Sequence, residues 1–103
     1  YAPRTPMQVL DVAAIARALQ GAVPVAAMVR EDAGLHTQTN VVVLANHPAA
    51  YARDFYRVLR ELDSGGYAQI LVQALPESAS WAAVQDRLRR AAHRDPGDLS
   101  DNG

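Results

Sequence analysis

Arginine side chains near the end of the sequence are the residues whose type and spacing most favour a chemical role. Arg87, Arg90 and Arg94 recur at i, i+3 and i+7, which places them on one face of a helix, and Arg89 lies beside them. Guanidinium groups in such a row can hold a phosphate or the carboxylates of a neighbouring domain. They can also form a solvated face in which Asp86 pairs with Arg90 and the positive charges complement the helix C-terminus. The spacing favours the solvated face.

Other side chains that could take part in catalysis lack the partners that they would need. Asp11 stands alone before a helical pattern and is predicted to be a helix N-cap. His47 could act as a general base, but no carboxylate or nucleophile is near it in sequence, so a capping or surface role is favoured. Ser78 and Ser80 lack a G-x-S-x-G elbow and are predicted to cap the last helix. No triad or carboxylate pair emerges from these residues.

Sites for phosphates and metals are not indicated either. The first strand-to-helix turn, VLDVAA, has no glycine and therefore carries neither a dinucleotide fingerprint nor a phosphate loop. His36 and His93 have no partner at metal-ligand spacing. All ten basic residues are Arg, and the absence of Lys removes Schiff-base and phosphate-loop mechanisms. We expect no catalytic residue, no metal and no cofactor in this chain.

The composition limits the class of protein. A length of 103 residues is enough for one domain with one core. Half of the residues are apolar, which excludes intrinsic disorder for the body of the chain. The longest apolar run, residues 22–29, is too short to cross a membrane. A net charge of −1 argues against direct binding of nucleic acid. We expect neither a membrane nor a nucleic acid as partner, and the absence of Cys favours a cytoplasmic setting.

The order of the predicted elements indicates the fold class. Apolar, β-rich runs predict strands, and apolar residues at helical spacing predict helices. The strands are expected at residues 7–10, 23–29, 41–45 and 67–73, and the helices at 11–19, from Pro48 to the SGG stop, and at 79–93. This alternation predicts an α/β fold: a small three-layer Rossmann-like domain with a mainly parallel sheet of about four strands and flanking helices.

The helices are expected to bury one face each. In the longest helix the apolar stripe contains Tyr51, Phe55, Val58, Leu59 and Leu62. In the last helix it contains Trp81, Val84, Leu88 and Ala91. On the exposed side of the longest helix, Arg57 and Glu61 are spaced for an ion pair.

The two ends of the chain differ from its body. The stretch YAPRTP holds two prolines, which restrict the backbone to an extended strap. We expect residues 1–6 to be an interdomain linker, 7–93 an accessory domain and 94–103 a polar tail. A strap of this kind joins two domains, so we expect a further domain to precede Tyr1.

Three stretches, taken in order, resemble one family, the long two-domain threonylcarbamoyl-AMP synthases. YAPRTP resembles the end of their His-Tyr-x-Pro linker, although the His is absent. Residues 51–76, YARDFYRVLRELDSGGYAQILVQALP, resemble their C-terminal domain, where an Ala-Arg-x-Leu-Tyr-x-x-Leu-Arg-x-x-Asp helix leads into an Ile-Leu-Val strand ending in Pro. Phe55 stands where Leu is usual. Residues 81–92, WAAVQDRLRRAA, resemble the Ala-Ile/Val-x-Asp/Asn-Arg-Leu-x-x-Ala-Ala signature of the final helix.

The resemblance implies a YrdC-like catalytic domain, then the linker, then a Rossmann-like C-terminal domain in one chain. Such enzymes join L-threonine, bicarbonate and ATP into threonylcarbamoyl-AMP and pyrophosphate, for threonylcarbamoylation of adenosine 37 in tRNA. ATP and Mg²⁺ would be substrate and ion of the full-length enzyme, and the YrdC-like domain would be the partner of this chain. We therefore expect the 103-residue chain alone to be inactive.

The resemblance also suggests residues for a site. The linker of such enzymes crosses the mouth of the active site, which makes Tyr1 and Arg4 candidates for lid contacts. Five residues of the matched motifs are candidates for domain docking, anion binding or hydrogen bonding within the fold: Arg60, Asp63, Asp86, Arg87 and Arg90. The alternative function is a stand-alone Rossmann-like module that binds a nucleotide or small anion at its strand ends.

Overall fold

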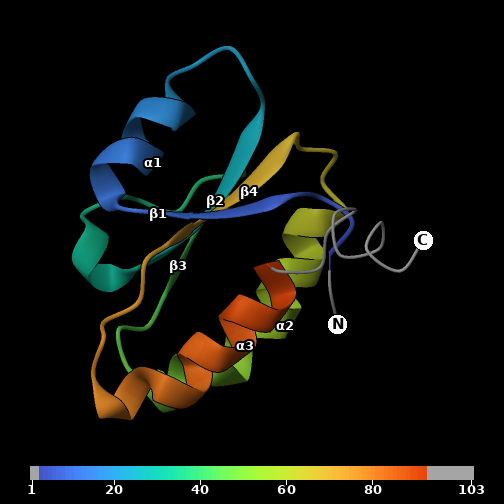
Figure 1. Ribbon diagram of the computed structural model, residues 1–103. Coiled ribbons are helices and arrows are strands. Elements are labelled where there is room, and N and C mark those ends of the chain that lie inside the picture. The colour runs from blue at the N-terminus through green and yellow to red at the C-terminus, as the bar shows by residue number, and fades with distance from the viewer. Residues whose placement is uncertain (1–2, 93–103) are drawn as a thin grey trace.

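Four parallel strands form the centre of the domain within residues 3–92, the part of the chain that the computed structural model describes (Figure 1). They are β1 (Met7–Leu10), β2 (Val25–Arg30), β3 (Val41–Leu44) and β4 (Gln69–Gln73). Their order in the sheet is β1-β4-β2-β3, and every pairing is parallel. The apolar strands β4 and β2 are therefore central, and β1 and β3 are the edges.

Helices cover both faces of this sheet. α1 (Val12–Leu19) lies on one face, and α2 (Pro48–Asp63) and α3 (Ala82–Ala92) lie on the other (Figure 1). Two short 3-10 turns complete the order: η1 (Glu31–Ala33) follows β2, and η2 (Ala79–Trp81) precedes α3. The expected three-layer, Rossmann-like α/β architecture is confirmed.

Local signals place the ends of α1 and α2 close to where the sequence predicts them. Asp11 caps α1, because its Oδ1 accepts a hydrogen bond of 2.8 Å from the backbone N–H of Ala14. Pro48 is the first residue of α2, where its missing N–H leaves no bond unmade. Gly66, with φ +77°, turns the chain away after α2 in a conformation that suits glycine.

The sheet separates the core into two layers. The larger layer lies under α2 and α3 and includes both predicted helix stripes, with Phe55 and Trp81 buried in it. The smaller layer lies under α1 and is built around Ile15. Leu35 packs against this smaller layer, so the loop from β2 to β3 covers the sheet beside α1 where a crossover helix would otherwise lie.

Several predicted boundaries are wrong by a few residues. β2 begins at Val25 and ends at Arg30, because Val23 is 58% exposed and the side chain of Arg30 is held at the strand end by hydrogen bonds. β3 ends at Leu44, and β4 begins at Gln69. The last predicted helix is a 3-10 turn followed by α3 from Ala82, and its predicted end at His93 lies outside the described residues.

The buried aromatic residues give a first test of this fold. Replacing Phe55 or Trp81 by Ala should lower the free energy of unfolding by about 3–5 kcal/mol, because each change opens a cavity in the larger core layer. That is a large part of the ~5–15 kcal/mol typical of a domain. Urea unfolding measures the loss, and Val23→Ala at an exposed position is the control. A loss for Phe55→Ala no larger than that of the control would show that the core is misplaced.

Candidate functional site

Open α/β sheets bind ligands beyond the carboxyl ends of their strands, and in this domain a buried arginine occupies that place. Arg30 is the last residue of β2, and its side chain is only 5% exposed. Its guanidinium donates from Nε to Asn46 Oδ1 at 2.9 Å and from Nη1 to the carbonyl oxygen of Ala74 at 2.9 Å. The third contact is an ion pair of 3.4 Å with Asp32, whose side chain is 48% exposed.

Glutamine 73 extends this network to the central strand β4. The side chain of Gln73 is buried at the end of β4, and its Oε1 accepts a hydrogen bond of 2.8 Å from the backbone N–H of Arg30. Its Nε2 lies 3.4 Å from Asp32 Oδ1. The backbone N–H of Asn46 donates to Glu31 Oε1 at 3.0 Å. The loops after β2, β3 and β4 are thereby joined by one set of polar contacts.

Aromatic side chains close the network on the side of α2 and α3. The guanidinium carbon of Arg30 lies 5.4 Å from the centre of the Trp81 ring, in a cation–π contact. Trp81 meets Tyr51 edge to face, with ring centres 5.5 Å apart. The Tyr51 hydroxyl is buried and has no hydrogen-bond partner among residues 3–92. Burial raises the pKa of the Tyr51 phenol well above its ordinary value of 10.0, and the positive charge of Arg30 opposes part of that rise.

The chemistry of this cluster is structural. A guanidinium offers hydrogen-bond donors and no acceptor, so Arg30 is suited to bind oxygen atoms. Its Nε and both terminal nitrogens already donate to protein oxygens, and its charge is paired with Asp32. The cluster therefore ties strand ends together, and the charge of Arg30 is already paired within the domain.

The sequence contained a signal for this cluster that spacing arguments missed. The strand predicted at residues 23–29 stops short of Arg30, but Arg30 directly follows the apolar run of residues 25–29, as Gln73 follows that of residues 70–72. Two polar residues at the carboxyl ends of two buried strands meet when those strands are neighbours in the sheet. That β2 lies next to β4 could not be read from the sequence.

One place where folds of this kind bind a phosphate is already occupied. The N-terminus of α1 is the place for a phosphate in such folds, but the Asp11 carboxylate occupies it as the cap and carries a negative charge. Among residues 3–92 no group of three or more His, Cys, Asp or Glu side chains could hold a metal ion.

The other candidates of the sequence lie on surfaces. His47 is exposed at the N-cap position of α2, where its side chain makes no capping hydrogen bond. Ser78 precedes η2 and also makes no capping bond, but its hydroxyl lies 3.1 Å from that of Ser80. The predicted Arg57–Glu61 ion pair is confirmed at 3.2 Å.

The arginine row on α3 is largely a solvated face. The predicted Asp86–Arg90 pair is confirmed at 3.0 Å, and Arg89 lies 3.5 Å from the same carboxylate. Arg87 is exposed, and Arg94 lies outside the described residues. These contacts pair Asp86 with Arg90. That the arginine row docks on another domain stays a prediction.

The remaining two docking candidates lie near the C-terminal end of α2. Arg60 is exposed in the last turn, and Asp63 is the last residue of the helix. Asp63 contacts the N-terminal strap through the backbone N–H of Arg4, at 3.2 Å from Oδ2. Of the two lid candidates, Arg4 is exposed and Tyr1 lies outside the described residues.

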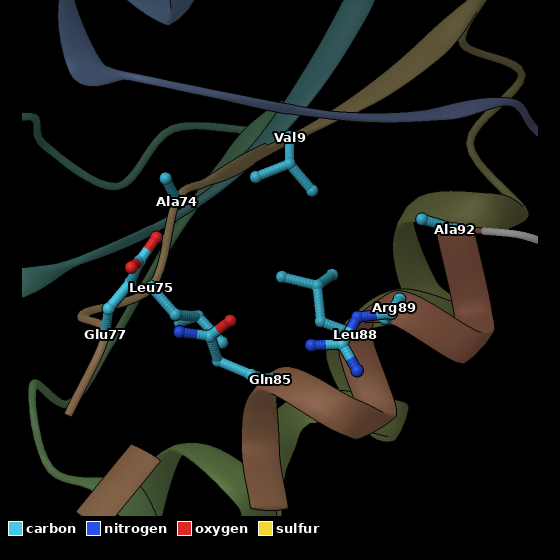
Figure 2. Close-up of a pocket in the computed structure, with 8 residues that line it drawn as sticks. All are labelled: Val9, Ala74, Leu75, Glu77, Gln85, Leu88, Arg89 and Ala92. Atoms are coloured by element: carbon cyan, nitrogen blue, oxygen red, sulfur yellow. The ribbon is translucent and has the colours of Figure 1, made fainter. Parts of the chain in front are cut away.

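A hollow of about 320 Å³ lies between β1 and α3. Figure 2 shows Val9 and Leu88 pointing toward one another across it, and Val9 is 41% exposed because α3 does not cover the edge strand fully. The other residues that line it are Ala74, Leu75, Glu77, Gln85, Arg89 and Ala92. The hollow can accept an apolar group but contains no pairing of nucleophile and base.

These features define a small three-layer α/β domain whose buried polar cluster is structural. Among its described residues no helix is long and apolar enough to cross a membrane. The family model for the C-terminal domain of threonylcarbamoyl-AMP synthase matches residues 1–93, so the chain belongs to this family, as the sequence resemblance predicted. A search of curated proteins and a search of solved structures found no match. The family places the chain in the context of tRNA modification.

Removal of the Arg30 side chain tests the structural reading of the cluster. Arg30→Met should lower the free energy of unfolding by about 2–3 kcal/mol, because the Ala74 carbonyl and the Asn46 side chain lose their donor. Arg57→Met, which breaks two exposed ion pairs, with Asp54 and with Glu61, is the control and should cost about 1 kcal/mol or less. Equal losses for the two variants in urea unfolding would argue against the cluster as a staple of the fold.

The raised pKa of Tyr51 predicts a dependence of stability on pH. The unfolded chain ionises this phenol near pH 10, whereas the folded chain keeps it protonated. The contribution of Tyr51 to the free energy of unfolding is therefore complete below the pKa of the unfolded chain. It is lost as the pH rises toward the higher pKa of the folded chain. Urea unfolding of the wild type should show this fall, and Tyr51→Phe should lack it while being at least as stable at neutral pH. Parallel pH curves for the two proteins would contradict the prediction.

Proposed function

We propose that this chain is the C-terminal accessory domain of a two-domain threonylcarbamoyl-AMP synthase, with catalysis in a preceding YrdC-like domain. The full enzyme would join L-threonine, bicarbonate and ATP into threonylcarbamoyl-AMP and pyrophosphate in the cytoplasm. The observation that carries the proposal is the family membership over residues 1–93, which includes the strap as well as the domain. At the carboxyl ends of the strands the side chain of Arg30 is hydrogen-bonded to the neighbouring loops, which supports a role of this domain outside the chemical step.

The function of this chain is then to hold the linker and to dock on the catalytic domain. Formation of an acyl-adenylate needs positive groups around the α-phosphate and a positioned threonine and bicarbonate. In this reading the YrdC-like domain supplies them, with ATP and Mg²⁺ as its substrate and ion. Arg4 and Tyr1 would contact the mouth of that active site, and Arg60, Arg87 and Arg90 would face the docked domain.

The division of labour can be tested by activity. Given ATP, L-threonine, bicarbonate and Mg²⁺, the 103-residue chain should release no pyrophosphate above background, whereas the two-domain enzyme should be active. In the two-domain enzyme, Tyr1→Ala should lower turnover because a lid contact is lost, and Arg17→Ala, on the exposed face of α1, should not. Circular dichroism controls for folding.

Each result has a separate meaning. Threonine-dependent pyrophosphate release by the 103-residue chain would overturn the assignment of chemistry to another domain. An unchanged turnover of Tyr1→Ala would overturn the lid role alone. Tight binding of ATP by the 103-residue chain in equilibrium dialysis would favour the alternative, a module that captures a nucleotide by itself.

A further inference from the structure

Asp63 carries a negative charge at a place where a helix disfavours it. It is the last residue of α2, and the dipole of a helix concentrates partial negative charge on the carbonyl groups at this end. An acidic side chain at this position therefore needs hydrogen-bond donors from another part of the chain to offset the unfavourable interaction with the helix dipole. The structure supplies such donors from a segment 58 residues away in sequence.

The donors belong to the N-terminal strap. The backbone N–H of Arg4 donates to Asp63 Oδ2 at 3.2 Å, and that of Thr5 donates to Oδ1 at 2.9 Å. The Thr5 hydroxyl donates to the same Oδ1 at 2.7 Å. Both carboxylate oxygens thus accept from two consecutive residues, and hydrogen bonds to a charged acceptor are the stronger kind. We call this set of contacts among Arg4, Thr5 and Asp63 the clasp.

The strap is fixed on both sides of the clasp. Pro3, before it, is fully buried. Pro6, after it, accepts a hydrogen bond of 2.8 Å from the backbone N–H of Ile70 and so continues the pairing of β1 with β4. The two prolines also fix their own φ angles. Residues 3–6 are therefore held against the domain by burial and by hydrogen bonds.

We propose that Asp63 is a positioning residue, which fixes the strap on this domain so that the chain before Pro3 leaves it in one defined direction. The inference rests on the proposed function, in which that chain is the linker to the catalytic domain. Asp63 touches no reactant in this role. It acts through Thr5 and Arg4. A linker whose end is fixed on this domain loses less conformational entropy when it is held over the active-site mouth than a linker whose end is mobile.

The clasp itself is tested on the 103-residue chain by amide hydrogen exchange. Asp63→Ala should reduce the protection of the Arg4 and Thr5 amides about tenfold, the loss expected when an amide loses a charged acceptor. The Ala27 amide in β2 should keep its protection. Glu61→Ala is the matched control, because it removes the same charge from the same helix without touching the strap. Equal loss of protection at Ala27 and Thr5 would overturn the clasp in favour of a general role in stability.

The positioning role is tested in the two-domain enzyme by a double-mutant cycle. Asp63→Ala should lower kcat about tenfold, and Thr5→Val, which keeps the two backbone donors of the clasp, should lower it less. The KM for L-threonine should change less than about twofold in both, because a misplaced lid affects the reacting geometry more than binding. The double variant should lose no more than Asp63→Ala alone, since that change already removes the carboxylate that accepts the hydrogen bonds of the clasp. Thr5→Ser, which keeps the hydroxyl, should restore the wild-type rate.

The outcomes separate this inference from the proposed function. A parent two-domain enzyme without threonine-dependent pyrophosphate release overturns the proposed function, and the positioning role with it. An active parent whose Thr5→Val and Asp63→Ala variants match it in kcat overturns the positioning role alone. Losses that multiply in the double variant, or a Thr5→Ser variant as slow as Thr5→Val, also overturn it.

Discussion

The guanidinium group of Arg30 is buried at the carboxyl ends of the strands, so its donors must find acceptors within the protein. Those acceptors come from Asn46 after β3 and Ala74 after β4, and one cation therefore fixes the loops that follow three of the four described strands. Trp81 covers the cation and so places the start of α3 as well. In many open α/β domains these loops are available for ligands, whereas here they are bound to one another.

The opposite end of the sheet is organised by a second charge. Asp63 lies before β4 in the chain, and its partner Thr5 lies before β1, so the clasp sits at the amino ends of these two strands. The N-terminal strap consequently arrives at the end of the sheet that ligands of such folds do not use. One buried cation and one carboxylate thus give the two ends different tasks: Arg30 closes one end, and Asp63 holds the incoming chain at the other.

Much of this fold could be predicted from the sequence because local patterns determine it. The cap at Asp11, the proline that starts α2, the buried stripe around Phe55 and the surface pair of Arg57 and Glu61 all depend on neighbours within a few residues. The family resemblance, too, was carried by short contiguous stretches. The position of Arg30 was missed because a charged residue next to a polar run has the local pattern of a loop, and its burial depends on partners that lie 16 to 44 residues away.

The sequence by itself determined which segments are helices and strands and that they form a three-layer α/β domain. Only the tertiary structure decided the strand order, which places Gln73 beside Arg30, and the use of Asp63 as an acceptor for the strap. In the sequence, Asp63 is one of several polar residues on an amphipathic helix, and only the fold places Thr5 within hydrogen-bonding distance of it. The physical reason is that local patterns determine the backbone conformation. The partner of a polar side chain depends instead on which distant segment the packing of the core places within hydrogen-bonding distance.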